Sequence, residues 1–160
     1  MVICSNDYMI TQKIKDFLDL QKLGYVATVT IDGKPNISPK GTIIAWTSEV
    51  LAFADIRSPD TIKNLQNNPH VEINVIDPLL RKGYLFQGQA RIVKDNSQFE
   101  EILAHYRKKG IKSPINSIVL VDVSKVSEIP ISYNGEVTSD TFETSTNTIE
   151  LIGLLIPFFL

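Results

Sequence analysis

The sequence predicts a mainly β protein in which six antiparallel strands close into a small barrel, with a few short helices. Apolar and polar residues alternate in several short runs, as in "VEINV" at 71–75, and this period of two indicates strands with one buried face and one wet face. The runs follow one another through short turns and do not alternate with helices, which excludes a doubly wound α/β fold. Gly88 interrupts a later run and suggests the bend or bulge that barrels use at corners.

The first third of the chain is expected to form one helix and three strands. Residues 11–23 place apolar side chains at helical spacing, with Thr11 as the N-cap and Gly24 as the C-terminal stop. Asp32-Gly33 is a strong hairpin turn between the first two strands. The three strands are expected over residues 25–31, 36–46 and 50–55.

Two helices and three strands are expected in the remainder. A short helix follows the third strand and ends at Asn67-Asn68-Pro69. A longer helix begins with a capping box of Ser97 and Glu100 and runs through Lys109, where Gly110 ends it. The last three strands are expected over residues 71–75, 84–93 and 117–123.

Length and composition predict one domain over residues 1–136, followed by a polar tether and an apolar segment over residues 137–160. The formal net charge of -2 argues against nucleic-acid binding, which needs a basic surface.

Cys4 is the single cysteine, so no internal disulfide is expected, and without a signal peptide the cytoplasm is the expected compartment. Residues 149–160 are too few to span a bilayer, so we expect them to pack on the domain or cover a subunit surface, with membrane association as the alternative.

The sequence contains no self-contained catalytic set. His70 and His105 lack metal-ligand spacing to a second histidine, a cysteine or a carboxylate cluster, and we expect both to be surface or partly buried imidazoles. A nucleophile role is not expected for Cys4, so close to the N-terminus. Neither a glycine-rich phosphate loop nor a nucleophile elbow occurs. If the protein is an enzyme, a bound cofactor is therefore expected to do the chemistry.

The stretch "RSPDT" at 57–61 has two interpretations. In the first, Ser58 caps the short helix, Pro59 takes the first helical position and Asp60 offsets the positive end of the helix dipole. In the second, Arg57, Ser58 and Thr61 hold a phosphate together with free N–H groups at the helix start. Asp60 counts against the second interpretation, because a carboxylate competes with a bound anion. The local sequence leaves both open.

A wider pattern adds to this local one. The segments "GYVATVTIDGKPNISPKGTI", "LAFADIRSPDTIKNLQNNPHVEINVID" and "RKGYLFQGQARIV" together resemble the pyridoxamine 5'-phosphate oxidase-like family of FMN-binding split barrels. The resemblance runs from about Leu23 to Val93 and rests on the order of weak motifs: an alanine-threonine strand, Asp-Gly-x-Pro, a threonine followed by "NLxxNP", and "GQA". It implies a homodimer that holds one FMN in each of two clefts between the subunits.

The resemblance also implies positions for the cofactor. The strand along the isoalloxazine edge falls on Ser38, Pro39, Lys40, Gly41 and Thr42. The phosphate cradle falls on Ala54 to Asn64, with Arg57, Ser58 and Thr61 as the contacts and Asp55 and Asn64 as helpers. Arg81 and Lys82 precede a strand that approaches the phosphate, across the dimer. The alternatives are a solvated hairpin lysine at Lys40 and a basic surface loop at Arg81 and Lys82.

The chain departs from the true pyridoxamine phosphate oxidases at several positions. Those enzymes have an arginine at the position of Ser38 and a lysine at the position of Ile43. They also have Ser-Arg-Lys at the positions of residues 59–61. Their C-terminal substrate segment has no counterpart, since Trp46 is the only tryptophan. We therefore expect an FMN-dependent oxidoreductase or flavin reductase that takes electrons from a nicotinamide or another small molecule, rather than a vitamin B6 oxidase. The alternatives are a deazaflavin or haem in the same cleft, a non-catalytic flavin store or sensor, and a barrel that has lost its ligand.

Overall fold

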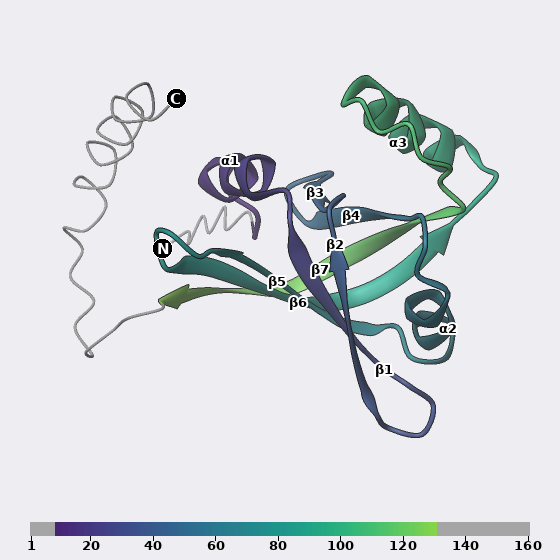
Figure 1. Ribbon diagram of the computed structural model, residues 1–160, viewed down its shortest axis with the longest axis horizontal. Helices are drawn as coiled ribbons and strands as arrows, with labels where there is room; N and C mark the ends of the chain where they lie inside the picture. Colours follow the sequence, from purple (N-terminus) through teal and green to yellow (C-terminus); the bar gives the residue numbers. More distant parts are fainter. Residues whose placement is uncertain (1–8, 131–160) are drawn as a thin grey trace, which may run out of the picture.

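The computed structural model describes residues 9–130, and their core is one curled antiparallel sheet with three helices packed around it (Figure 1). The sheet order is β2-β1-β5-β6-β7-β4-β3, and every pairing is antiparallel. The mainly β prediction is therefore confirmed.

Some predictions lie outside the described residues: Cys4, the end of the predicted domain at residue 136, and the predicted tether and apolar segment. The elements are α1 (Gln12–Gln21), β1 (Gly24–Val29), β2 (Pro35–Lys40), β3 (Ile44–Ala45), β4 (Val50–Asp55), α2 (Pro59–Asn67), β5 (His70–Asp77), β6 (Lys82–Val93), α3 (Ser97–Lys108) and β7 (Ser117–Pro130).

The described sheet has seven strands rather than six, because the strand predicted over residues 36–46 is divided. Lys40 makes the last pair of β2, opposite Gly24 in β1, whereas Ile44 makes the first pair of β3, opposite Ala52 in β4. The residues between them carry the chain from one edge of the sheet to the other. Alternation of side chains could not reveal this change of partner, since both halves are extended.

The bulge predicted at Gly88 is confirmed. The register of β6 against β7 shifts between Gln87 and Gly88, and a side chain at Gly88 would collide with the carbonyl oxygen of Asp122. Only glycine fits so close an approach of two backbones. β7 is longer than predicted, because it follows β6 along its whole length to Pro130.

Two helix ends differ from the prediction. The left-handed residue after α1 is Lys22, with φ 52°, whereas Gly24 lies in β1, where an added Cβ would approach the side chains of Ile43 and Val75. At the start of α3 the N-cap is Asn96, whose side chain accepts a 2.8 Å hydrogen bond from the N–H of Phe99, so the predicted Ser97 capping box is wrong. The amide of Asn96 therefore satisfies the N–H of Phe99, whereas the expected serine box would have satisfied the N–H of Glu100. Thr11 caps α1 as predicted, and Gly110, which has a positive φ, follows the end of α3 as predicted.

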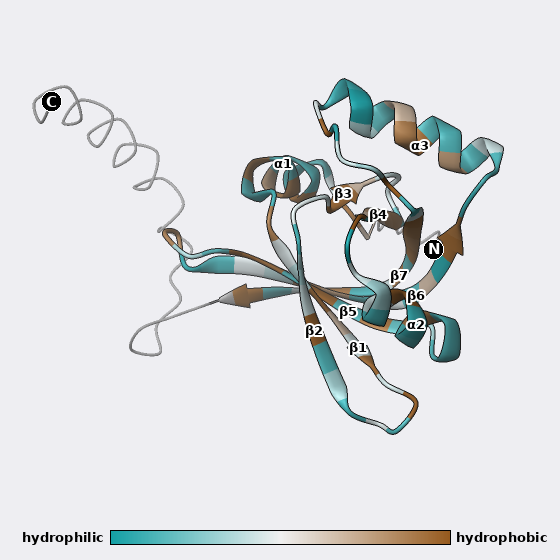
Figure 2. Ribbon diagram, turned by 45° about the vertical axis from the view of Figure 1, so that its right-hand side comes forward, coloured by the Kyte–Doolittle hydropathy of each residue, from teal (hydrophilic) through white to brown (hydrophobic). Residues whose placement is uncertain are grey.

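Strand β4 is buried on both faces and divides the core. Leu51 and Phe53 point into a cluster that includes α1, while Ala52 and Ala54 point into a second cluster beneath α3. β3 and β4 are correspondingly apolar in Figure 2. Because both faces are covered, the polar residue that ends β4, Asp55, is also buried. Among residues 9–130, no helix combines the length and the apolar character that a membrane span requires.

Candidate functional site

Buried polar side chains gather where β4 ends and α2 begins, and Asp55 is at their centre. One oxygen of its carboxylate accepts hydrogen bonds from the N–H of Ser58 at 3.2 Å and from the Ser58 hydroxyl at 2.9 Å. The other accepts a longer bond, 3.5 Å, from the hydroxyl of Ser117 at the start of β7. All three residues are buried. A buried carboxylate with three donors is a fixed polar centre rather than a solvated surface group.

Lys40 brings a positive charge to the same part of the barrel. Its side chain is only 7% exposed, and its ammonium group donates to the Ser38 hydroxyl at 2.8 Å. The ammonium nitrogen also lies 6.0 Å from the centre of the Phe53 ring. Burial lowers the pKa of Lys40, and the negative charge of Asp55 opposes this shift. The structure thus rules out the solvated hairpin lysine that was the alternative for this position.

The start of α2 has no side-chain cap. Ser58 occupies the N-cap position, but its hydroxyl hydrogen is directed at Asp55 and its oxygen accepts no bond from the helix. Pro59 takes the first helical position, as predicted, and the N–H of Ile62 makes the first helical bond, to the Ser58 carbonyl at 3.2 Å. The N–H groups of Asp60 and Thr61 have no acceptor within residues 9–130. Ser58 therefore takes the N-cap position, as the first interpretation expects, but its side chain caps no N–H group, and two donors remain at a positive helix end.

Arg57 precedes the helix start, and Thr61 and Asn64 form the inward face of α2. Arg57 is exposed and makes no hydrogen bond or ion pair with any described residue. Thr61 and Asn64 face the barrel, at 2% and 5% exposure, and the Asn64 amide donates to the hydroxyl of Thr28 in β1 at 3.0 Å. Asn64 therefore anchors the helix to the sheet, and Arg57 is the exposed cation beside the helix start.

The segment predicted to lie along a flavin ring occupies the edge of the sheet. β2 pairs only with β1, so alternate backbone N–H and C=O groups of Ser38–Lys40 make no hydrogen bond within the sheet. Thr42 ties the segment that follows to the rest of the barrel: its hydroxyl accepts from the N–H of Ala54 at 3.0 Å, and its carbonyl accepts from the Tyr106 hydroxyl at 2.8 Å. Pro39 and Gly41 are exposed.

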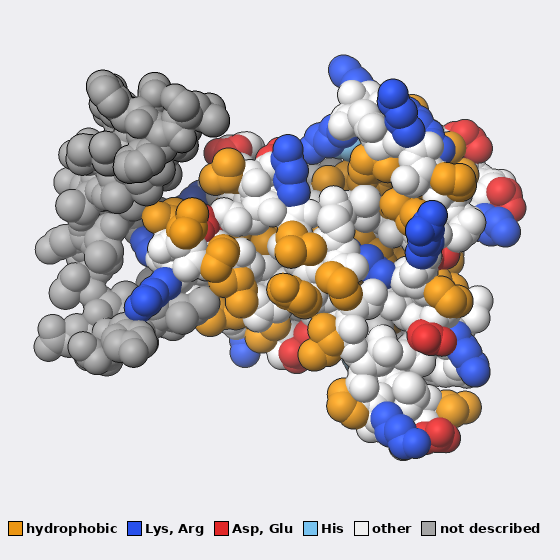
Figure 3. Space-filling view, viewed as in Figure 1, with side chains coloured by type: hydrophobic (Ala, Val, Ile, Leu, Met, Phe, Trp, Pro, Cys, Tyr) orange, Lys and Arg blue, Asp and Glu red, His pale blue; other side chains and the backbone are white. Residues whose placement is uncertain are grey.

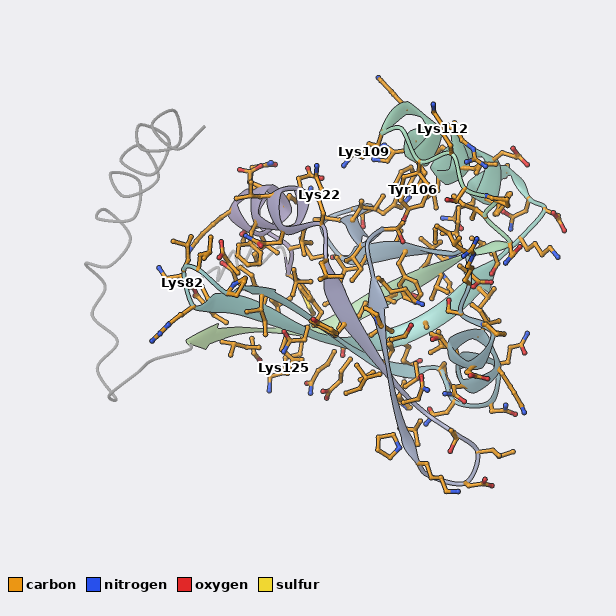
Figure 4. All side chains as sticks on the ribbon, in the orientation of Figure 1. Lys22, Lys82, Tyr106, Lys109, Lys112 and Lys125 are labelled. Atoms are coloured by element: carbon orange, nitrogen blue, oxygen red, sulfur yellow. The ribbon has the colours of Figure 1, made fainter. Side chains whose placement is uncertain are left out.

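Nine predicted residues therefore lie in one region at the open edge of the barrel: Ser38, Lys40, Thr42, Ala54, Asp55, Arg57, Ser58, Thr61 and Asn64. Arg81 and Lys82 lie elsewhere: Lys82 is the first residue of β6, at the end of the strand far from Val93, and Arg81 precedes it. Figure 4 shows Lys82 in this position. Within one chain they do not join the start of α2. Their expected contact with a phosphate across a dimer stays a prediction.

The sequence interpretation missed three residues that complete this region: Thr28, Tyr106 and Ser117. A usable signal existed for Thr28, because it lies two residues after Val26, on the buried face of an alternating strand. A polar residue at such a core position needs a buried partner. Tyr106 and Ser117 carried no comparable signal, since their partners are distant in sequence.

The histidines lie away from this region. His105 is half-buried in α3 and packs edge-on against Trp46, with ring centres 5.8 Å apart. His70 is exposed at the start of β5 and lines an open groove of about 780 Å³ whose wall also includes Glu72 and Gln89. In the part of the chain that the structure describes, no three His, Cys, Asp or Glu side chains are grouped as metal ligands would be.

Comparisons with known proteins agree with this architecture. HupZ from Group A Streptococcus is 28% identical, with a TM-score of 0.68, over 80% of this chain and 100% of that one. HutZ, the haem storage protein from Vibrio cholerae, is 20% identical, with a TM-score of 0.60, over 76% and 94% of the two chains. An F420 reductase is 25% identical, with a TM-score of 0.53, over 69% and 94%. A search of curated protein sequences returned no match.

The sequence itself decides the family. The family profile described as pyridoxamine 5'-phosphate oxidase matches residues 10–129, which is nearly the whole of the described domain. The split in the sheet, between the edge strand β2 and the pair β3–β4, is consistent with that match. This chain belongs to the pyridoxamine 5'-phosphate oxidase family.

Proposed function

We propose that this protein is a flavoprotein that binds FMN at the start of α2 and acts as an oxidoreductase. The observation that carries the proposal is the uncapped helix start: Ser58 gives its hydroxyl hydrogen to Asp55, which leaves the N–H groups of Asp60 and Thr61 without acceptors among the described residues. A phosphate supplies the acceptors that such a helix end lacks. Arg57 is exposed and comes directly before Ser58 in the chain, so its guanidinium can reach a phosphate at this helix start.

The charges at this helix start favour a phosphate on balance. A hydrogen bond between an arginine and an anion contributes about 1.5–3 kcal/mol, and a helix dipole contributes roughly 0.3–1 kcal/mol more. The carboxylate of Asp60 opposes the anion, but it is exposed, so water screens it. The buried charge of Asp55 is offset by Lys40 and by its three donors. The residues present therefore suit a phosphate group.

The edge strand β2 and the residues after it suit the ring of the same cofactor. Unpaired backbone groups of Ser38–Lys40 offer donors and acceptors to a polar rim. Bound FMN would supply hydride and electron transfer, which no side chain here supplies. The chain's part is to orient the ring and to provide the positive charge of Lys40, which stabilises negative charge that develops nearby.

A second copy of the chain is part of the proposal. The outward face of the β1–β2 hairpin carries Tyr25, Val29, Ile31 and Ile37, which are 45%, 36%, 78% and 66% exposed. So many large apolar side chains on one hairpin are typical of a surface that another protein covers. In a dimer, the resemblance would bring Arg81 and Lys82 of one subunit close to the phosphate bound by the other.

Absorbance of the purified protein tests the proposal. Bound flavin gives absorbance bands at about 375 and 450 nm, and a yellow protein that oxidises NADH or NADPH is an oxidoreductase. A yellow protein that leaves both nicotinamides unchanged would be a flavin store or sensor instead. A colourless protein that takes up no FMN in excess would contradict the proposal.

Haem is a second candidate, because one observation favours it. His70 is the only imidazole on the wall of the 780 Å³ groove, and a histidine is the commonest axial ligand of haem iron. HutZ, which shares the fold, is a haem storage protein. An intense haem absorbance band that is lost in His70→Ala would favour haem over flavin. A deazaflavin, the alternative raised by the F420 reductase, would give an absorbance spectrum that differs from the flavin spectrum.

A further inference from the structure

A second hollow lies between α1 and α3, away from the start of α2. It measures about 430 Å³ and is formed by the end of α1, the residues between β2 and β3, and the end of α3. That volume is within the range of small-molecule sites, roughly 300–1,000 Å³. Figure 4 shows Lys22 on the α1 side of this space, with Tyr106, Lys109 and Lys112 on the α3 side.

The floor of the hollow is apolar and uncharged. Leu18, Ile43 and Tyr106 are exposed by only 2%, 4% and 0%, so their side chains belong to the core. The hydroxyl of Tyr106 is already bonded to the Thr42 carbonyl, and burial raises the pKa of this phenol, which keeps it neutral. A ligand that reached the floor would therefore need an apolar body.

The rim of the hollow is positively charged. Lys109 and Asp19 neutralise each other, because the ammonium nitrogen lies 2.6 Å from the carboxylate oxygen. Lys22 is exposed and is held at the C-cap of α1 with φ 52°, where its N–H donates to the Leu18 carbonyl, but its ammonium group has no hydrogen-bond or ion-pair partner within residues 9–130. Lys112, close by on the α3 side, likewise has no partner there. Figure 3 shows basic side chains gathered along this edge of the molecule.

We propose that this hollow binds a small apolar carboxylate, with its carbon body on the floor and its charge at Lys22. A neutral apolar molecule would make no interaction with the charge of Lys22. A compact dianion would find no donor on the apolar floor, so most of its polar surface would lose water without gaining a new partner. A single carboxylate on an aromatic or branched carbon body satisfies both the floor and the rim.

The same hollow borders the predicted ring site. Gly41 and Thr42 line it and also belong to the segment expected along the flavin. If FMN binds as proposed, the carboxylate would be the second ligand of the reaction, and this part of the inference rests on the proposed function. Binding to the hollow itself requires no cofactor.

Titration of the full-length, flavin-free protein with phenylacetate, followed by amide NMR, tests the site. Phenylacetate should shift the resonances of residues around the hollow, while phenethylamine, which has a similar body and the opposite charge, should not. Lys22→Glu should weaken phenylacetate binding about tenfold, because attraction is replaced by repulsion. Lys34→Glu, at an exposed hairpin lysine, is the matched control and should leave the affinity unchanged.

Three results would overturn the inference: no shifts with phenylacetate, equal binding of the amine, or equal affinities of Lys22→Glu and Lys34→Glu. Because the titration contains no flavin, it can fail or succeed whether or not FMN binds. A protein that binds FMN but not phenylacetate would retain the proposed function and lose this site.

Discussion

The starts of α2 and α3 differ in how the first N–H groups of each helix are bonded. At α3 the side chain of Asn96 accepts from the N–H of Phe99 at 2.8 Å. At α2 the corresponding residue, Ser58, donates to Asp55 instead and caps nothing. Both residues favour N-caps, so the difference arises from the buried carboxylate that precedes one helix and not the other. Capping groups in a sequence thus show where a helix starts, but not whether its donors are satisfied.

Removal of Asp55, the carboxylate that makes the start of α2 differ from that of α3, should have the largest effect on stability. Asp55→Ala leaves the Ser58 N–H and the Lys40 charge without their buried partner, so it should lower the free energy of unfolding by about 3 kcal/mol. Urea denaturation measures this. Asp122→Ala, at an exposed carboxylate, is the control and should change the value by less than about 0.5 kcal/mol. Equal losses in the two variants would show that Asp55 is not the centre of the site.

The two cap residues should respond differently in a double-mutant cycle. Ser58→Ala should cost about 1.5 kcal/mol, the scale of a hydrogen bond to a charged group, and much less when Asp55 is already alanine. Asn96→Ala should cost about 1 kcal/mol in both backgrounds, because its partner is the helix itself. If the effects of Ser58→Ala and Asp55→Ala on the free energy of unfolding were additive, the serine would contribute independently of Asp55.

The far end of α3 is also bonded within the chain, through Tyr106. Tyr106→Phe removes the bond to the Thr42 carbonyl and should cost about 1 kcal/mol near neutral pH. Burial raises the pKa of Tyr106, so above about pH 10 the unfolded chain loses this proton while the folded chain keeps it. The tyrosine's contribution should therefore fall as the pH rises, and the gap between wild type and variant should narrow. A gap that stayed constant up to about pH 11 would contradict a buried, neutral phenol.

The smallest expected effect concerns the exposed carboxylate at the start of α2. Asp60→Asn removes a negative charge beside the proposed phosphate, so FMN should bind more tightly, by up to about 1 kcal/mol at low salt. Equilibrium titration by fluorescence measures the change. Weaker FMN binding in the variant would place the phosphate elsewhere.

Much of the architecture could be predicted from the sequence, because alternation marks the strands and Gly88 marks the bulge. The division at residues 41–43 could not, since it depends on which strand each extended half pairs with. At the site, Lys40 and Asp55 were identified by family resemblance, but their burial follows from the packing on both sides of β4. The donors to Asp55 include Ser117, which is separated from it by 62 positions, and no local pattern links the two.

Arg57 offers the most direct test of the central claim, that an anionic cofactor binds at the uncapped start of α2. FMN affinity should be compared in wild type, Arg57→Ala and Lys63→Ala, the last being an exposed cation further along the same helix. Arg57→Ala should weaken binding by about 1.5–3 kcal/mol, roughly ten- to hundredfold, with no loss of folding stability, and Lys63→Ala should bind as wild type does. Equal affinities in all three proteins, or no FMN binding by wild type, would contradict the account.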